Sequence, residues 1–350
     1  MRIGVIGSGS FGTALAHLLG EKHMDVTLYG RDKTLLKLIE DGRRNVKYLP
    51  QLSISENVKT ECEISLATGH KDLIVMATPS QSFRHVFTEI QPYIGRDTII
   101  VNVAKGIEKE SLLTLSQVAD QVATEFHQRS QGNSTANHRD PLKYVTLSGP
   151  SHAEEVALGL PTTVSCASKE QNLSNKVQEI FSTRRFRVYT NEDLLGVELG
   201  GALKNVMALG AGISDGLGFG DNGKAALMTR GMAEISRLGV KMGAKLTTFA
   251  GLTGMGDLIV TCTSVHSRNR KCGILMGSGA TLDEAVREVG MVVEGISSTF
   301  AAAALARKYQ VQMPIVETIE SCLLGKCSAK EAIEQLMTRE LKDESPFVYI

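Results

Sequence analysis

The sequence predicts an α/β protein in which a doubly wound parallel sheet is followed by an all-helical C-terminal half. Three observations lead to this prediction. Short apolar runs alternate with helical stretches up to about residue 190, an order typical of a parallel sheet with crossover helices. A glycine-rich turn joins the first apolar run to the first helix. Beyond residue 190 alanine, leucine, methionine and glycine dominate at helical spacing, and strand signals fade.

The N-terminal half is organised around its opening turn. Residues 1–6 form an apolar strand, Gly7, Gly9 and Gly12 follow as G-x-G-x-x-G, and residues 13–19 have helical character. Gly7 permits a tight turn, Gly9 lets a pyrophosphate approach the backbone, and Gly12 lets the helix lie close to the strand. The free N–H groups at the helix start suit the phosphates. The stretch predicts a Rossmann-type dinucleotide-binding domain rather than an ordinary Gly-rich turn.

Length and charge are those of a two-domain globular protein. At about 150 residues per domain, 350 residues suit two domains, which we place at 1–190 (dinucleotide-binding) and 191–350 (helical, substrate-binding). Lys and Arg total 38, as do Asp and Glu, so bulk charge points to no nucleic-acid partner and no anionic membrane. No apolar run reaches the ~20 residues of a membrane span, and no basic, apolar leader precedes the first strand. We expect a cytoplasmic protein without stable membrane insertion.

The cysteines indicate neither disulfides nor a metal site. There is no Cys-x-x-Cys pair and no Cys/His cluster at zinc spacing. We interpret the six as scattered reduced thiols of a cytosolic protein and expect no metal. They are Cys62, Cys166, Cys262, Cys272, Cys322 and Cys327.

The end of the second strand is where a protein of this kind selects its cofactor. The strand over 25–30 leads into Arg31 and Asp32. An acidic side chain there binds the 2′-hydroxyl of NAD, whereas an arginine accepts the 2′-phosphate of NADP. Arg31 therefore favours NADP(H), with NAD(H) possible. The alternative is that Arg31 is a solvated loop cation.

Further elements follow in alternation up to residue 190. We expect helices over 33–41, 82–90 and 173–181 and from His152, and strands over 71–79, 98–103, 143–147, 162–167 and 186–189. Ser151 and Glu154 predict a capping box at the start of the His152 helix. Residues 127–141 are polar, with almost nothing to bury, and predict a mobile surface loop.

Ligands of such sheets bind beyond the carboxyl ends of the strands. That rule singles out Thr78-Pro79-Ser80 and Ala104-Lys105-Gly106. Lys105 at a strand end can reach a bound anion, or it is a plain surface lysine.

A long helix over 192–213 opens the second half. Glycine inside a helix costs about 1 kcal/mol relative to alanine, so Gly200 and Gly201 indicate that another segment approaches this helix closely. Lys204 lies one turn later on the same face. It could exchange a proton with a carbinol oxygen while hydride moves at the carbon. The alternative is a snorkelling surface lysine.

Two later stretches suit a phosphorylated substrate. Residues 251–257 form a glycine-rich bend ending in Asp257, which lacks the Gly-Lys-Ser/Thr ending of a phosphate loop; Asp257 could be only a helix cap. Ser267-Arg268-Asn269-Arg270 places hydroxyl, guanidinium and amide groups together, which suits capture of a phosphate. The cluster could equally be a solvated turn.

Together these stretches resemble the bacterial NAD(P)-dependent sn-glycerol-3-phosphate dehydrogenases. The resemblance spans residues 1 to about 340 in the family's order, which is specific although the opening fingerprint alone is not. The matching stretches are Gly7-Ser-Gly-Ser-Phe-Gly-Thr, Ala104-Lys-Gly, Leu147-Ser-Gly-Pro-Ser, Glu198-Leu-Gly-Gly-Ala-Leu-Lys-Asn, Gly251-Leu-Thr-Gly-Met-Gly-Asp-Leu, Thr261-Cys-Thr-Ser, Ser267-Arg-Asn and Val293-Glu-Gly.

The resemblance implies roles for some of the matching residues. Lys204 would be the proton donor and acceptor. The dinucleotide would be bound by Ser10, Phe11, Arg31, Lys105, Ala153, Arg268, Val292 and Glu294 beside the fingerprint glycines. Glycerol 3-phosphate would be held by Lys105, Gly149, Ser151, Lys204, Asp257, Ser267, Arg268 and Asn269.

The implied reaction is reduction of dihydroxyacetone phosphate by NAD(P)H to sn-glycerol 3-phosphate, which feeds phospholipid synthesis. The family pairs the dinucleotide domain with an all-helical domain, and its members are commonly dimers. The chain departs from the family in one place, because the polar stretch between Lys105 and Gly149 looks longer than usual. That difference could alter association or access.

Two other functions remain open on the sequence. One is a related dehydrogenase on the same two-domain plan, acting on another small hydroxy acid or acyl substrate. The other is a dinucleotide-sensing module without catalysis. The Ser267-Arg268-Asn269 cluster is the feature that discriminates the first, and a substrate screen would settle it. Lys204 together with Arg268 argues against the second.

Overall fold

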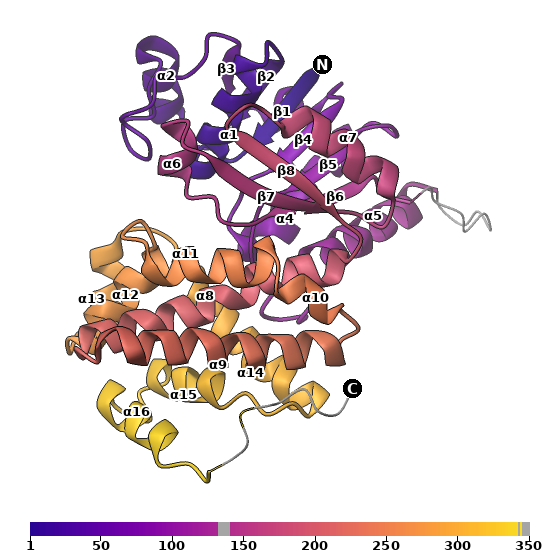
Figure 1. Cartoon of the computed structure of the whole chain (residues 1–350). Helices are drawn as coiled ribbons and strands as arrows, with labels where there is room; N and C mark the ends of the chain where they lie inside the picture. Colours follow the sequence, from indigo (N-terminus) through magenta and orange to yellow (C-terminus); the bar gives the residue numbers. More distant parts are fainter. Residues whose placement is uncertain (132–140, 342–343, 345–350) are drawn as a thin grey trace. The chain divides into compact units, whose positions relative to one another are not determined.

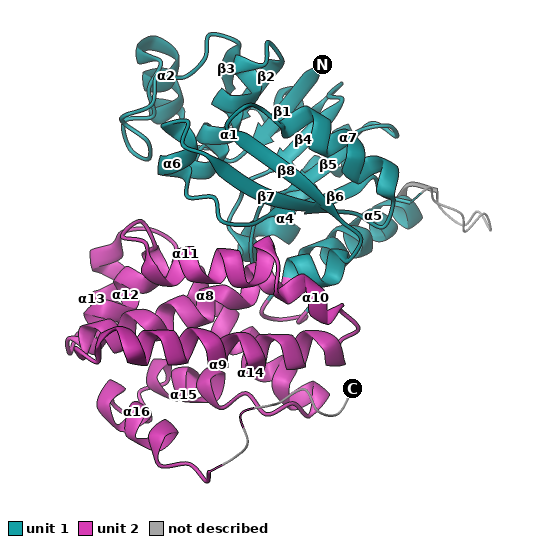
Figure 2. Ribbon diagram, viewed as in Figure 1, with its two compact units in different colours: residues 1–108, 113–198 teal, residues 109–112, 199–350 magenta. Residues whose placement is uncertain are grey.

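The computed structural model describes residues 1–131, 141–341 and 344, which form two compact units (Figures 1 and 2). Unit 1 is Met1–Glu108 and Leu113–Glu198, and unit 2 is Lys109–Leu112 and Leu199–Ile350. The sequence analysis placed a boundary near residue 190, at the end of the strands. The units divide later, inside a long helix, because Leu194 and Val197 of that helix pack into a core beside the sheet of unit 1.

Unit 1 is built on one eight-stranded sheet in the order β3-β2-β1-β4-β5-β6-β7-β8 (Figure 1). The chain runs outward from β1 to β3 and crosses back to β4, so the order reverses between β1 and β4. This reversal is the place where doubly wound sheets bind ligands. The strands are β1 (Arg2–Ile6), β2 (Asp25–Tyr29), β3 (Val58–Glu61), β4 (Leu73–Met76), β5 (Ile99–Asn102), β6 (Tyr144–Ser148), β7 (Thr162–Ala167) and β8 (Phe186–Asn191).

The prediction of a parallel sheet is wrong at one pair. β6 and β7 are antiparallel, whereas the other neighbouring pairs are parallel. The connection between them contains only α6, whose 5 residues span about 7.5 Å. Parallel strands are usually joined by a long crossover helix, and α6 is too short to serve as one. β7 therefore runs the opposite way.

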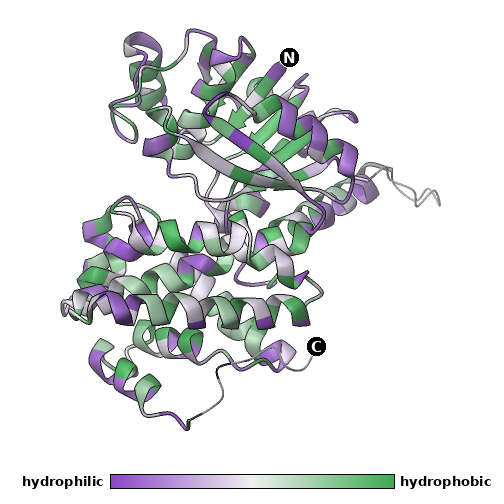
Figure 3. Ribbon diagram, in the orientation of Figure 1, coloured by the Kyte–Doolittle hydropathy of each residue, from purple (hydrophilic) through white to green (hydrophobic). Residues whose placement is uncertain are grey.

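Helices cover both faces of the sheet. On β4, Leu73 and Val75 belong to a core shared with α1 and α7, while Ile74 and Met76 belong to a core shared with α4 and α5. This alternation follows from the two-residue period of a strand, and the central strands are accordingly hydrophobic (Figure 3). The helices are α1 (Ser10–Glu21), α2 (Lys33–Gly42), α3 (Ile64–Thr68), α4 (Phe83–Ile90), α5 (Leu115–Gln131), α6 (Ala153–Ala157) and α7 (Gln171–Phe181), with short 3-10 turns η1 (Ser80–Ser82) and η2 (Gln91–Tyr93).

Three elements of unit 1 were not predicted: the short helix α3, the strand β3 and the helix α5. β3 is an edge strand of four residues with one apolar side chain, Val58, so it carries almost no strand signal. α5 buries Leu115, Val118, Ala119 and Val122 at helical spacing. Because α5 continues to Gln131, the prediction of a loop is wrong for 127–131; residues 132–140 of that loop lie outside the described residues.

Unit 2 is helical. The expected long helix is α8, which forms over Leu194–Gly216. The others are α9 (Gly220–Lys241), α10 (Leu246–Phe249), the π-helical turn η3 (Leu252–Gly256), α11 (Asp257–Thr263), α12 (Arg268–Gly277), α13 (Leu282–Val289), α14 (Glu294–Tyr309), α15 (Pro314–Leu323) and α16 (Ala329–Met337). The all-helical C-terminal half is thus confirmed.

The sequence analysis was wrong to find no apolar segment long enough to cross a membrane. α8 has 23 residues and a mean hydropathy of 1.2 over its most apolar window, which suffices by length and composition. Of that window, 94% is buried inside the structure. A mostly apolar helix that is covered by protein is a core helix, and α8 is the core helix of unit 2.

Glycines allow α8 and α12 to touch through their backbones. A Cβ on Gly212 would lie 2.1 Å from the carbonyl oxygen of Arg270, and a Cβ on Gly273 would lie 2.1 Å from that of Leu209. One turn further along, Gly216 of α8 is equally close to α12. Because each contact is to backbone, no side-chain movement could make room for a methyl group.

We expect Gly212→Ala to lower the free energy of unfolding by about 1–3 kcal/mol, the usual cost of overpacking a tight contact. Urea denaturation measures the change. Gly223→Ala in α9 is the matched control, because its Cβ would lie 3.5 Å from the nearest atom. The control should gain up to about 1 kcal/mol from helix propensity. Equal stability of the two variants would contradict the close packing of α8 on α12.

Candidate functional site

The turn after β1 has the shape that the glycine fingerprint predicts. Gly7 has φ 126°, and a Cβ there would lie 2.5 Å from the carbonyl oxygen of Ala77, after β4. A Cβ on Gly12 would lie 2.0 Å from the carbonyl oxygen of Gly7, so α1 packs directly on the turn. A Cβ on Gly9 would meet nothing within 4 Å. Gly7 and Gly12 therefore serve the fold, and the space at Gly9 is left for a ligand.

The helix start and the neighbouring strand end suit a phosphate. α1 begins at Ser10 and Phe11, and its N-cap Gly9 has no side chain to cover their N–H groups. The hydroxyl of Thr78 is buried and has no hydrogen-bond partner among the described residues. Thr78 follows Ala77, and its backbone N would lie 3.4 Å from a Cβ on Gly7. A buried hydroxyl without a partner beside this turn fits a site that a dinucleotide completes.

Arg31 is free to bind a ligand, whereas its neighbour is not. The Asp32 carboxylate caps α2 by accepting a hydrogen bond from the Leu35 N–H at 3.0 Å. The exposed Arg31 guanidinium has no hydrogen bond or ion pair with any residue that the structure describes. The guanidinium is the group at the end of β2 that remains available for a 2′-phosphate.

The structure brings together Lys105, Gly149 and Ser151 in unit 1. The Lys105 ammonium donates a hydrogen bond to the Gly149 carbonyl oxygen at 2.8 Å, and the Ser151 hydroxyl donates to the same oxygen at 2.9 Å. The predicted capping box at Ser151 is therefore wrong. His152 is the N-cap of α6, and α6 has no side-chain cap, because the Ser151 hydroxyl is engaged upstream. Ala153, the first residue of α6, is buried in the sheet's core.

Lys204 forms a buried ion pair with Asp257 in unit 2. Their side chains are 7% and 1% exposed, and the ammonium donates directly to the carboxylate. The ammonium also donates to the Thr261 hydroxyl at 2.7 Å, and that hydroxyl donates to the Asp257 carbonyl oxygen at 2.6 Å. Lys204 is thus no snorkelling surface lysine, and Asp257 is more than a helix cap.

The close approach predicted at the paired glycines explains how this ion pair forms. A Cβ on Gly200 would lie 2.9 Å from the carbonyl oxygen of Thr253 in η3. Lys204 lies four residues after Gly200 on α8, and Asp257 lies four residues after Thr253, so the same two faces meet again one turn later. The sequence analysis assigned no role to Thr261. Its spacing of four residues from Asp257, on one helix face, was the available signal.

The Ser267–Arg270 cluster is a helix start rather than a solvated turn. The Ser267 hydroxyl caps α12 by accepting from the Arg270 N–H at 3.2 Å, and the Arg270 guanidinium is bound to Asp215 at 2.7 Å. The exposed Arg268 guanidinium, by contrast, makes no hydrogen bond or ion pair within the described part of the chain. Of the two arginines, Arg268 is the one available for a phosphate.

Asn269 ties three helices together beside Arg268. Its amide nitrogen donates to the Asn205 side-chain oxygen at 2.9 Å, and its amide oxygen accepts from the Gly295 N–H at 2.9 Å. Asn205 follows Lys204 on α8, and Gly295 follows Glu294 at the start of α14. The half-buried Glu294 and the exposed Val292 precede Gly295 in the sequence, so this hydrogen bond brings their part of the chain to Asn269. The amide pair holds the helix of Lys204 against the helix of Arg268.

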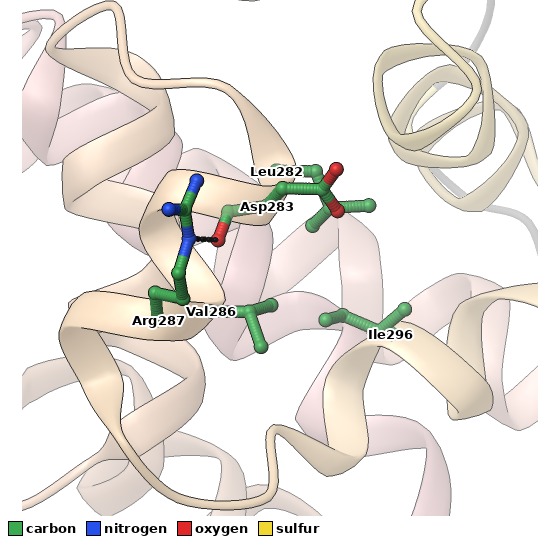
Figure 4. A pocket seen from close by; sticks show the side chains of 5 residues that line it. All are labelled: Leu282, Asp283, Val286, Arg287 and Ile296. Carbon is green, nitrogen blue, oxygen red and sulfur yellow. Dashed lines mark hydrogen bonds between the residues drawn. The ribbon is translucent and has the colours of Figure 1, made fainter.

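A pocket of about 560 Å³ lies elsewhere in unit 2, between α13 and α14 (Figure 4). Its lining side chains are Leu282, Asp283, Val286, Arg287 and Ile296. None of them is a residue that the sequence analysis assigned to cofactor or substrate. No group of three or more His, Cys, Asp or Glu residues suited to a metal ion occurs among the described residues.

Comparison with known proteins decides the family. The family model described as NAD-dependent glycerol-3-phosphate dehydrogenase N-terminus matches residues 2–174, and that of the C-terminus matches residues 193–334. The chain belongs to the NAD-dependent glycerol-3-phosphate dehydrogenase family. Membership confirms the resemblance stated above and makes the protein an oxidoreductase that uses a nicotinamide cofactor.

Individual family members match over nearly the whole chain. A Clostridium botulinum protein named glycerol-3-phosphate dehydrogenase (NAD(P)+) is 50% identical over 98% of this chain and 99% of its own length. A Carboxydothermus hydrogenoformans protein of the same name is 47% identical over 99% of each chain. The crystal structure of glycerol-3-phosphate dehydrogenase from Coxiella burnetii matches with a TM-score of 0.88 at 35% identity, covering 97% of this chain and 99% of that chain.

Proposed function

We propose that the chain reduces dihydroxyacetone phosphate to sn-glycerol 3-phosphate, with Lys204 as the proton donor and Arg268 as the phosphate ligand. The observation that carries the proposal is the buried Lys204–Asp257 pair. Burying two charges costs desolvation energy, and a lysine without a function inside the protein would avoid that cost by lying at the surface. Family membership supplies the reaction. In the reverse direction Lys204 accepts the proton.

Reduction of the ketone requires a hydride at carbon and a proton at oxygen. A bound nicotinamide supplies the hydride. The Lys204 ammonium, held by Asp257 and Thr261, donates its proton to the C2 oxygen as negative charge develops there. The Asp257 carboxylate stabilises the ammonium form before transfer. The Thr261 hydroxyl accepts a hydrogen bond from the ammonium and keeps it oriented.

Arg268 has the properties expected of the residue that binds the substrate's phosphate. Its guanidinium is exposed, has no partner within the described residues, and begins α12, whose N-terminus carries a positive dipole end. Ser267 and Asn269 flank it and would complete the phosphate contacts that the resemblance implies. The resemblance also implies that the substrate is bound by Lys105, Gly149 and Ser151, and we adopt this assignment. The hydrogen bonds that these three residues share support a common role.

We propose NADP(H) as the preferred cofactor, with NAD(H) also accepted. The support is the contrast between the two residues after β2, since Asp32 is engaged as a helix cap while the Arg31 guanidinium is free. Ser10, Phe11 and Ala153 would contact the dinucleotide beside the fingerprint glycines. The resemblance alone implies further contacts with the cofactor, from Val292, Glu294, Lys105 and Arg268.

The setting of the enzyme is also a proposal. All six cysteines are free thiols, which supports a reducing compartment such as the cytoplasm. We infer that the product enters phospholipid synthesis, as the resemblance implies. The homodimer stays a prediction.

We expect Lys204→Ala to lower kcat for dihydroxyacetone phosphate by about 100- to 10,000-fold, the usual contribution of a general acid, while cofactor binding stays near normal. The assay is the initial rate followed by absorbance of the reduced nicotinamide, with cofactor titration in parallel. Unchanged turnover would refute the role of Lys204.

Loss of folding must be separated from loss of chemistry in that experiment. Lys204→Ala leaves the Asp257 charge buried and unpaired, which costs about 3–5 kcal/mol. The double variant Lys204→Ala/Asp257→Asn removes that charge, so it should recover much of the stability while remaining inactive. Recovery of turnover with stability would mean that the ion pair is structural only.

Arg268→Ala should raise the KM for dihydroxyacetone phosphate by about 10- to 100-fold, because a charge-assisted hydrogen bond contributes about 1.5–3 kcal/mol. Arg268→Lys should recover part of the loss, since an ammonium keeps the charge but not the bidentate geometry. Lys271→Ala, an exposed cation on the same helix, is the control and should behave as wild type. An unaltered KM and rate in Arg268→Ala would count against phosphate capture.

For the cofactor, Arg31→Ala should raise the KM for NADPH about tenfold or more and leave the KM for NADH nearly unchanged. Initial rates with each reduced cofactor in turn measure the ratio. Lys37→Ala, an exposed cation on α2, controls for a general loss of positive charge. If both KM values rise equally, Arg31 does not read the 2′-phosphate.

A further inference from the structure

Two of the six cysteines are not scattered, contrary to the sequence analysis. The Cys322 and Cys327 sulfurs lie 3.8 Å apart in unit 2. Cys322 lies in the last turn of α15 and Cys327 lies in the connection to α16. Both side chains are partly exposed, so a small molecule in solution can reach them.

The backbone holds the two thiols together. Gly325 has φ 66°, the left-handed conformation that ends a helix, and its N–H donates to the Cys322 carbonyl oxygen at 3.0 Å. Just after Cys327, Ser328 begins α16 with a capping box to Glu331. The Cys322 thiol also donates to the Ser328 carbonyl oxygen at 3.9 Å. Two closely spaced helix ends thus hold the sulfurs side by side.

We propose that Cys322 and Cys327 form a redox-sensitive dithiol site, which a hydroperoxide oxidises to an intramolecular disulfide. A disulfide has an S–S length of about 2.05 Å, so each sulfur moves by about 1 Å or less on average from the present separation. The disulfide links the last turn of α15 covalently to the connection that leads into α16. No residue assigned to cofactor or substrate takes part.

The oxidation proceeds in two balanced steps. One thiolate attacks a peroxide oxygen, which breaks the O–O bond, releases hydroxide and leaves a sulfenic acid on sulfur. The second thiol then attacks that sulfur and displaces its oxygen as water. In total two thiols and one hydrogen peroxide give one disulfide and two waters. A dithiol reductant returns the pair to the reduced form by thiol–disulfide exchange.

The surroundings of the two sulfurs predict the order of the steps. Burial, and the Cys327 thiol beside it, raise the pKa of the Cys322 thiol to about 12, so Cys322 stays protonated at neutral pH. Cys327 therefore reacts first, and Cys322 resolves the sulfenic acid. The thiols of Cys166, Cys262 and Cys272 are buried, and burial raises the pKa of each to between about 11 and about 12. These three stay inert.

Peptide mapping of the folded full-length protein tests the proposal. The protein is treated with hydrogen peroxide, alkylated with iodoacetamide and cleaved with trypsin. Because Lys326 lies between the two cysteines, cleavage there leaves two peptides that only a disulfide holds together. We expect this linked pair, two hydrogens lighter than the separate peptides, and its loss after dithiothreitol. Native oxidised protein should also show slower amide hydrogen exchange at the start of α16.

Serine variants make the test specific. Cys322→Ser should accumulate a sulfenic acid on Cys327 that dimedone traps, whereas Cys327→Ser should leave Cys322 unmodified. Cys62→Ser, which removes a partly exposed single thiol, should form the linked pair as wild type does. The proposal is overturned if the linked pair forms only in unfolded protein, or if Cys62 is oxidised while Cys322 and Cys327 remain alkylated. Circular dichroism verifies that each serine variant is folded.

Discussion

The buried ion pair between Lys204 and Asp257 is the interaction on which the helical unit depends. Two opposite charges at 7% and 1% exposure have lost most of their hydration, and only good geometry and further hydrogen bonds repay that loss. Thr261 provides one such bond to the ammonium at 2.7 Å. A lysine in this setting is held in one orientation. For a proton donor, a fixed orientation matters more than the contribution that the ion pair makes to the stability of the fold.

The surrounding structure serves to bring these groups together. Gly200 has no side chain, so the backbone at Thr253 can approach α8, and Asp257 arrives opposite Lys204 one turn later. Gly212 lets α12 approach the same helix further along. The small residues of α8 are therefore a condition for the charge pair and for the position of α12, and their helix-propensity cost is offset by these contacts.

Hydrogen-bond partners decide which of several similar side chains are available for ligands. Arg270 is bound to Asp215, and Asp32 caps α2. Arg268 and Arg31 remain unpaired within the described part of the chain. In unit 1 the Thr78 hydroxyl is likewise buried without a partner beside the fingerprint turn. Groups without hydrogen-bond partners that lie beside the fingerprint turn, at the end of β2 or at the start of α12 are the ones that a phosphate or a dinucleotide is expected to complete.

Much of the fold could be predicted from local patterns. The strand–turn–helix at Gly7 to Gly12, the long helix after residue 190 and the helical second half all follow from periodicity and glycine spacing. The elements that were missed carry weak or overlooked signals. β3 has one apolar residue, and the buried face of α5 preceded a polar stretch that suggested a loop. The direction of β7 has no local signal, because it depends on the length of the connection.

By itself the sequence determined the fold class, the opening dinucleotide turn, the family and the residues from which a site could be built. Only the tertiary structure decided that Lys204 meets Asp257 and Thr261, that Arg268 rather than Arg270 is free, and that Cys322 lies beside Cys327. The physical reason is that periodicity and turn chemistry are set by neighbours along the chain. Which partner a side chain has, how deeply it is buried and whether it is available for a ligand depend on residues that packing brings to it from distant parts of the chain.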